Sequence, residues 1–126
     1  MRLYEITSNW QHKFYWFEEP FDPDVKRFIL GNPNPHACDM CQEESVTWAK
    51  KLVMKGFDVG LHGGLFTDPT EFEIGHAWVT VNGKIFDPTA SQFTDHMPDL
   101  EIQEGYYVEH YDVHGKDVLQ VQAPFI

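Results

Sequence analysis

Residues 75–87 read GHAWVTVNGKIFD, and this stretch decides the fold that we predict for the chain. Its first half alternates in side-chain character, as a strand with one buried face does. Asn82-Gly83 follows, and this dipeptide is among the strongest signals of a two-residue hairpin turn. A second short strand comes directly after the turn. We therefore expect the two strands to pair, which would bring Asp87 close to His76.

The clearest helical pattern lies upstream, between Cys41 and Lys55. Cys41, Ser45 and Leu52 recur on one side at helical spacing, with Trp48 or Ala49 between them. Acidic residues come early in this segment and basic residues late, which is the arrangement that the helix dipole favours. Gly56 follows and is expected to end the helix.

Weaker patterns complete a single α+β domain spanning residues 1–126. Asp22-Pro23-Asp24 predicts the start of another helix, because proline is well tolerated in a first helical turn. Gly63-Gly64 is expected to end or bulge a strand. Including the two hairpin strands, strands are expected at about 3–7, 57–61, 74–81, 84–86, 106–113 and 118–122, with a hairpin turn at His114-Gly115. Residues 10–17 are expected to form a strand or an extended arm. We predict that the main helix packs on an antiparallel sheet of these strands.

The bulk composition narrows the class of protein. The chain has 126 residues, of which 42% are hydrophobic and 15% aromatic, as expected of one folded globule. Its formal net charge of −11 disfavours nucleic acid and anionic membrane as partners, since both attract basic surfaces. No apolar run approaches the ~20 residues of a membrane span, and the N-terminus lacks a signal-peptide layout. We therefore expect a cytoplasmic protein whose Cys38 and Cys41 are reduced thiols.

Cys41, His76 and Asp87 stand in the order of a cysteine catalytic triad. Cys41 opens the predicted helix, where unpaired backbone amides favour the thiolate, the reactive form of cysteine. His76 lies on the first hairpin strand and Asp87 at the end of the second. A carboxylate at that position can hold the imidazole tautomer and stabilise the imidazolium that forms when the thiol loses its proton. The pattern indicates a site for nucleophilic catalysis.

The residues around this constellation resemble those of a known superfamily. Gly75-His76-Ala77-Trp78-Val79 and Asp87-Pro88-Thr89 are similar to the histidine and aspartate motifs of the transglutaminase-like, papain-like cysteine enzymes. The helix that starts at Cys41 is similar to the nucleophile helix of that group. The resemblance covers about residues 38–93. It implies a papain-like α+β core and thiolate attack on an amide or ester carbonyl through an acyl-enzyme. Peptidase, amidase, deamidase and transglutaminase-type reactions are all open, on a peptide, a protein or a small amide, with no cofactor.

Three further residues are candidates for supporting roles. Trp78 shares the strand face of His76 and is expected either to shield the reacting pair or to pack in the core. Cys38 is expected to be a wall residue or a resolving thiol. The papain branch carries a glutamine upstream of the cysteine for the oxyanion hole, and here the nearest substitute is Gln11. The residues after the cysteine, 42–44, also depart from the family by being polar and acidic.

Two other classes of function compete with an enzyme. Cys38 and Cys41 form a CxxC, and seven histidines are present, so a Cys/His zinc site is one alternative. Against it, the chain has no second CxxC, and the histidine pair His110 and His114 spans an expected strand and turn. We therefore expect no metal. The other alternative is a non-catalytic binding module in which aromatic side chains, such as Trp10 and Trp16, line a groove for a partner.

Overall fold

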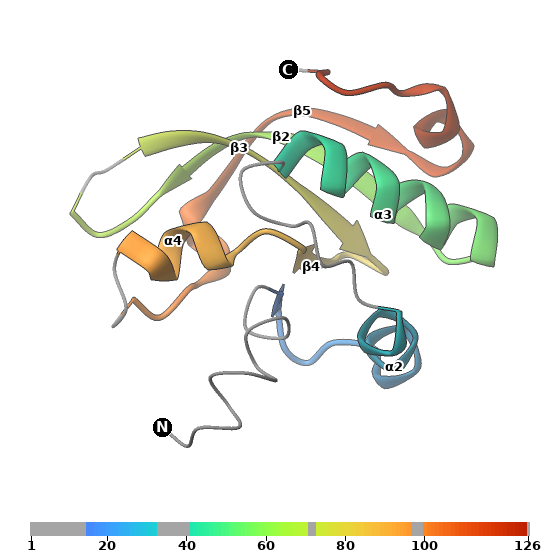
Figure 1. The fold of residues 1–126 in the computed structure, drawn as a ribbon, viewed down its shortest axis with the longest axis horizontal. Coiled ribbons are helices and arrows are strands. Elements are labelled where there is room, and N and C mark those ends of the chain that lie inside the picture. Colours follow the sequence, from blue (N-terminus) through green and yellow to red (C-terminus); the bar gives the residue numbers. More distant parts are fainter. Residues whose placement is uncertain (1–14, 33–40, 71–72, 97–99, 126) are drawn as a thin grey trace.

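The computed structural model describes residues 15–32, 41–70, 73–96 and 100–125, and it has an α+β fold. Its strands form one five-stranded antiparallel sheet in the order β1-β4-β3-β2-β5 (Figure 1). The predicted class and the antiparallel sheet are thus confirmed. The strands are β1 (Trp16–Phe17), β2 (Val59–Thr67), β3 (Glu73–Val81), β4 (Lys84–Asp87) and β5 (Tyr107–His114).

The helices surround this sheet, and one of them is much longer than the others. They are α2 (Pro23–Gly31), α3 (Cys41–Lys55) and α4 (Ser91–His96), together with the 3-10 turns η1 (Glu104–Tyr106) and η2 (Gly115–Gln120). The Asp22 carboxylate caps α2 by accepting the backbone N–H of Asp24 at 2.9 Å. The chain leaves α3 through Gly56, which adopts φ of 99°. Both helix predictions are confirmed, and no described helix is long and apolar enough to cross a membrane.

The predicted hairpin forms the middle of the sheet. Val81 pairs with Lys84, and the turn residues Asn82 and Gly83 have φ of 52° and 82°. Two successive positive φ values define the type I′ turn that Asn-Gly favours. β3 is the third of the five strands, so His76 lies on the central strand as predicted.

The two faces of β3 belong to two separate hydrophobic clusters. The main core contains Val79 and Val81 with Trp48 and Leu52 of α3. Side chains alternate along a strand, so His76 and Trp78 point to the opposite face. There a second cluster contains Phe66 and Phe93 among its buried residues. The long helix therefore covers one face of the sheet, and His76 belongs to the other.

β2 is longer than the sequence indicates, because it continues through Gly63-Gly64 instead of ending there. The pairing between β2 and β5 shifts register at these two glycines, so the predicted bulge is confirmed. A Cβ on Gly64 would lie 2.0 Å from the Val108 carbonyl oxygen, which explains why this position has no side chain.

Two expectations for the C-terminal third are wrong. Residues 118–120 belong to the 3-10 turn η2 and not to a strand, and His114-Gly115 does not close a hairpin. The physical reason is that Val118 is fully buried in the main core, which fixes this segment over α3 instead of beside β5. α4 was not predicted. The strands expected at 3–7 and over residues 10–14 lie outside the described residues.

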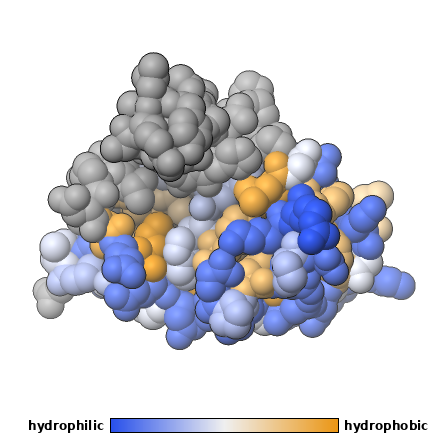
Figure 2. Space-filling view, turned by 90° about the horizontal axis from the view of Figure 1, so that it is seen from below, coloured by the Kyte–Doolittle hydropathy of each residue, from blue (hydrophilic) through white to orange (hydrophobic). Residues whose placement is uncertain are grey.

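The described surface is mixed in character. On the side shown in Figure 2, hydrophobic residues occupy separate areas among hydrophilic ones. Exposed large hydrophobic side chains in the described part of the chain are Met54, Val108, Tyr111 and Leu119.

Candidate active site

His76 and Asp87 form a hydrogen-bonded pair within the second cluster. The distance between His76 Nε2 and Asp87 Oδ2 is 2.6 Å, and both side chains are 0% exposed. The hairpin explains the contact, because it folds β4 back along β3 and places the end of β4 beside His76. The expected proximity of the two residues is therefore confirmed.

The Asp87 carboxylate accepts further hydrogen bonds besides the one from His76. The Tyr107 hydroxyl donates to Oδ2 at 2.8 Å, and the Thr89 backbone N–H donates to Oδ1 at 3.0 Å. Burial, followed by the charge of Asp87, raises the pKa of Tyr107 well above its ordinary value. The phenol thus keeps its proton and remains a donor. Buried negative charge is stable only with such partners, and here both carboxylate oxygens have them.

The second ring nitrogen of His76 faces Gln92 of α4. Gln92 Nε2 lies 3.2 Å from His76 Nδ1, 3.2 Å from the Thr89 carbonyl oxygen and 3.3 Å from Thr89 Oγ1. A carbonyl oxygen only accepts, so the Thr89 carbonyl identifies the Gln92 nitrogen as the donor. The Gln92 amide then donates to Nδ1, and Nε2 carries the proton that Asp87 accepts. Both neighbours of His76 therefore select the same tautomer, with the lone pair on Nδ1.

Aromatic rings enclose the pair. Trp78 stacks on His76 with centroids 6.0 Å apart and an interplanar angle of 21°. Phe93 meets the imidazole edge-on at 4.7 Å, and Tyr107 lies beside both His76 and Trp78. Trp78 is itself buried. It thus lies where the sequence predicted, covering the face of the histidine ring.

Cys41 is the first residue of α3, as predicted, although its side chain lies outside what the structure describes. One turn later, the Ser45 hydroxyl donates to the Ala77 carbonyl oxygen at 3.1 Å. Residues four apart share a helix face, so the start of α3 lies at the His76 end of β3. Cys38 and Gln11 lie outside the described residues.

A proline explains why Ser45 can reach this carbonyl. The β3–β4 pairing in the described residues stops at Val79 and Phe86. Continuing that register would place Pro88 opposite Ala77, and proline has no N–H to donate. Ser45 supplies the missing donor. The start of α3 is thereby anchored at the margin of β3, where the described residues show no pairing with β4.

Glu44, near the start of α3, is a buried acidic residue. Its side chain is 4% exposed, and one of its carboxylate oxygens has no hydrogen-bond partner. Burial raises its pKa to about 7, with Lys51 opposing the shift. The carboxyl group therefore titrates near neutral pH, three residues after Cys41.

Several histidines among the described residues have side-chain partners. His62 contacts Glu109 and Thr80, and His114 contacts Asp112. Within the described ranges, no group of three or more His, Cys, Asp or Glu residues could hold a metal ion. Cys38 of the CxxC lies outside those ranges.

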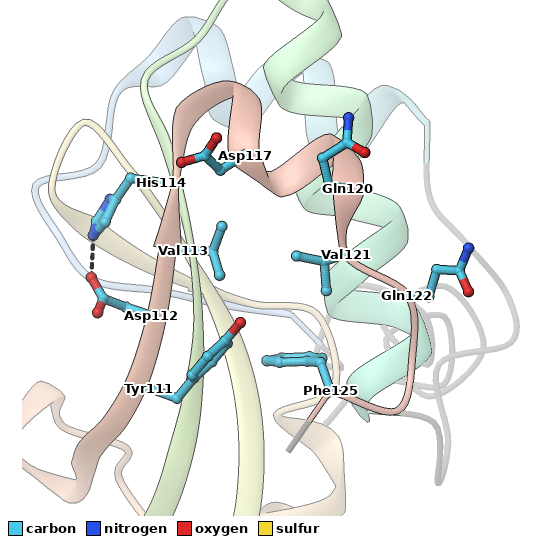
Figure 3. Close-up of a pocket in the computed structure, with 9 residues that line it drawn as sticks. All are labelled: Tyr111, Asp112, Val113, His114, Asp117, Gln120, Val121, Gln122 and Phe125. Atoms are coloured by element: carbon cyan, nitrogen blue, oxygen red, sulfur yellow. Dashed lines mark hydrogen bonds and ion pairs between the residues drawn. The ribbon is translucent and has the colours of Figure 1, made fainter.

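A groove of about 680 Å³ lies between β5 and the C-terminal segment (Figure 3). Val113 and Val121 face each other across it, and the Tyr111 and Phe125 rings approach at one end, with centroids 5.7 Å apart. The Phe125 N–H donates to the side-chain oxygen of Gln42 at 2.7 Å, which ties this end to the start of α3. His76 and Asp87 are not among its lining residues, which are Tyr111, Asp112, Val113, His114, Asp117, Gln120, Val121, Gln122 and Phe125.

Sequence reasoning missed two residues of the site, Tyr107 and Gln92. Tyr107 is 20 residues from Asp87 and Gln92 is 16 from His76, so no local pattern links them. The one sequence signal near Gln92 was the run of polar residues after Asp87, which indicated a turn but not a contact with His76. Comparison with known proteins adds no relative, since no protein-family model, curated protein or solved structure matches the chain.

Proposed function

We propose that this protein is a cysteine-dependent acyl-transfer enzyme in which Cys41, His76 and Asp87 form the catalytic triad. The observation that carries the proposal is the fully buried His76–Asp87 pair at 2.6 Å, with its imidazole lone pair on the other nitrogen. A structural histidine needs only satisfied nitrogens. Both nitrogens of His76 are satisfied, by Asp87 and by Gln92, and what supports a catalytic role is that the carboxylate leaves the lone pair on Nδ1, as a general base requires.

The proposed reaction begins when the Cys41 thiol gives its proton to Nδ1 of His76. The sulfur then attacks the carbonyl carbon of an amide or ester, and a tetrahedral oxyanion forms. When it collapses, the bond to the leaving nitrogen or oxygen breaks, and the Nδ1 proton goes to that atom. Water or an amine then attacks the thioester, and Cys41 is restored. Asp87 accepts the Nε2–H throughout and stabilises the imidazolium.

The position of Cys41 on α3 supports its role as the nucleophile. The backbone N–H groups of a first helical turn have no intrahelical partners and favour the thiolate. Because α3 and His76 belong to different faces of the sheet, the proposal requires the thiol to reach the imidazole past the margin of β3 beside Ala77, beyond the last described β3–β4 pair. We further propose that α3 and the hairpin correspond to the core of the transglutaminase-like, papain-like enzymes. The substrate would be a peptide, a protein or a small amide.

The proposal is tested with two small reagents that need no knowledge of the natural substrate. Iodoacetamide alkylates thiolates, and p-nitrophenyl acetate acylates them through an oxyanion. Modified residues are mapped by mass spectrometry between pH 5 and 9. We expect Cys41 to react first with both reagents, and to be acylated more slowly by roughly 10²–10⁴-fold in His76→Ala. The matched control is His110→Ala, which removes an exposed histidine of β5.

Three results would count against the proposal. If Cys38 reacts while Cys41 is inert, Cys38 and not Cys41 is the nucleophile. If His76→Ala reacts as His110→Ala does, His76 is not the base. If Cys41 is alkylated but never acylated, the non-catalytic binding module becomes the better explanation.

A further inference from the structure

The side-chain nitrogen of Gln92 lies near more hydrogen-bond acceptors than it has hydrogens to donate. This nitrogen has two hydrogens but lies 3.2–3.3 Å from three acceptors, namely His76 Nδ1, Thr89 O and Thr89 Oγ1. Two of these acceptors belong to Thr89, so the amide stays anchored there if it leaves the imidazole. His76 is fully buried, whereas Gln92 is only partly buried. Gln92 is thus the more accessible residue of the two.

We propose that Gln92 is the side-chain donor of the oxyanion hole, held on His76 Nδ1 while the site is at rest. This inference rests on the proposed acyl-transfer function and assigns the donor that the reaction requires. Such donors stabilise the negative charge that develops on the carbonyl oxygen in the transition state.

The proton transfer itself releases the donor. In the resting site, Nδ1 carries a lone pair and accepts the Gln92 N–H. When Nδ1 takes the Cys41 proton it becomes a donor, and it can no longer accept from Gln92. The released N–H then needs a new acceptor. The oxyanion appears in the same step and within the same small region, since sulfur, Nδ1 and the carbonyl must be in contact.

The other nearby donors do not fit this role. The Tyr107 hydroxyl donates to Asp87 at 2.8 Å, so the carboxylate occupies it. The Trp48 indole N–H has no partner among the described residues, but Trp48 is fully buried in the main core on the other face of the sheet. The Ser45 hydroxyl donates to the Ala77 carbonyl. Of these described donors, Gln92 alone contacts the base nitrogen.

The experiment compares two reactions of Cys41 in a Cys38→Ser background. Acylation by p-nitrophenyl acetate passes through an oxyanion, whereas alkylation by iodoacetamide does not. Gln92→Leu keeps the approximate size of the side chain but has no donor, and we expect it to slow acylation by roughly 10²–10³-fold. Alkylation should be unchanged or faster, because Gln92 no longer donates to Nδ1. Gln120→Leu, at an exposed glutamine of η2, is the control and should leave both rates unchanged.

A second variant keeps the test valid if Gln92→Leu does not fold. Gln92→Glu preserves shape, and its carboxylate cannot donate, so acylation should again fall more than alkylation. Native-like circular dichroism is required of each variant. Equal losses in both reactions would overturn the inference and leave Gln92 a structural residue, and unchanged acylation would also overturn it. A wild-type Cys41 that is alkylated but not acylated would refute the proposed function first, and this inference with it.

Discussion

Replacing Asp87 by asparagine should reverse the tautomer of His76 while the domain stays folded. Oδ1 of Asp87 accepts the Thr89 N–H, and Oδ2 accepts both His76 Nε2–H and the Tyr107 hydroxyl. Asparagine has the same shape but only one oxygen. If that oxygen still accepts the Thr89 N–H, the amide nitrogen takes the Oδ2 position. There it faces the His76 N–H and the Tyr107 hydroxyl, which are both donors. The tyrosine can rotate its hydroxyl away, but His76 must move its proton to Nδ1.

Changing the tautomer of His76 costs free energy because it removes the acceptor of the Gln92 amide. An Nδ1–H would point at the Gln92 amide N–H, which lies 3.2 Å away, so one buried donor loses its partner. An unpaired buried donor costs about 1–3 kcal/mol, less than the roughly 5–15 kcal/mol by which a typical domain is stable. Asp87→Asn should therefore unfold at lower urea concentration but remain native at 25 °C. Because Nδ1 can no longer accept a proton, acylation of Cys41 should fall by on the order of 10⁴-fold.

A second substitution separates stability from catalysis. Adding Gln92→Glu to Asp87→Asn places a carboxylate where it accepts Nδ1–H, but the carboxylate can no longer donate to the Thr89 carbonyl oxygen, so only part of the lost ~1–3 kcal/mol should return. Acylation should not return, because the lone pair now lies on Nε2. The ¹⁵N shifts of the two ring nitrogens report the tautomer directly, and urea unfolding reports stability. If Asp87→Asn keeps its proton on Nε2, or if the double variant regains acylation, the hydrogen-bond reasoning is wrong.

Two further predictions concern stability. The pKa of Glu44 is raised to about 7 in the folded protein from 4.5, so the fold favours the protonated carboxyl, and stability should increase as pH falls from about 7 to 4.5. Glu44→Gln should remove this pH dependence and raise the free energy of unfolding at pH 8 by at most about 3 kcal/mol. Urea unfolding of both proteins between pH 4.5 and 8 measures this. If stability depends on pH equally in the variant and the wild type, Glu44 is not the group responsible. Gly64→Ala should cost roughly 1–3 kcal/mol, because its Cβ would lie 2.0 Å from a backbone oxygen of β5. Gly75→Ala meets open space and should cost little, so equal losses in the two variants would contradict the crowding argument.

The parts of the fold that the sequence predicted are those with strong local signals. The Cys41–Lys55 helix has a regular apolar face and a glycine at its end, and its bounds are as predicted. The hairpin depends on Asn82-Gly83, whose φ values only a few residue types adopt readily. Since the turn is local and the side-chain period is two, the contact between His76 and Asp87 followed without tertiary information.

The rest could not be predicted because tertiary contacts decide it. Val118 and its neighbours suit a strand, yet burial of Val118 in the main core holds them in a 3-10 turn. Gln92 and Tyr107 reach the site only after α4 and β5 have folded over the second face. Their roles depend on which atoms meet, and no spacing in the sequence records that. The contact of the Cys41 thiol with His76 remains a prediction.

Asp87-Pro88-Thr89 reads in the sequence as a turn, but each of its residues has a separate physical effect on the site. Asp87 orients the imidazole through Nε2. Pro88 has no N–H, which accounts for the end of the β3–β4 ladder and leaves the Ala77 carbonyl to Ser45 at the start of α3. Thr89 donates its N–H to Asp87 and accepts from Gln92. One tripeptide thus links the carboxylate, the margin where α3 begins and the proposed oxyanion donor. Substituting Pro88 alone should therefore disturb the approach of Cys41 while leaving the His76–Asp87 hydrogen bond in place.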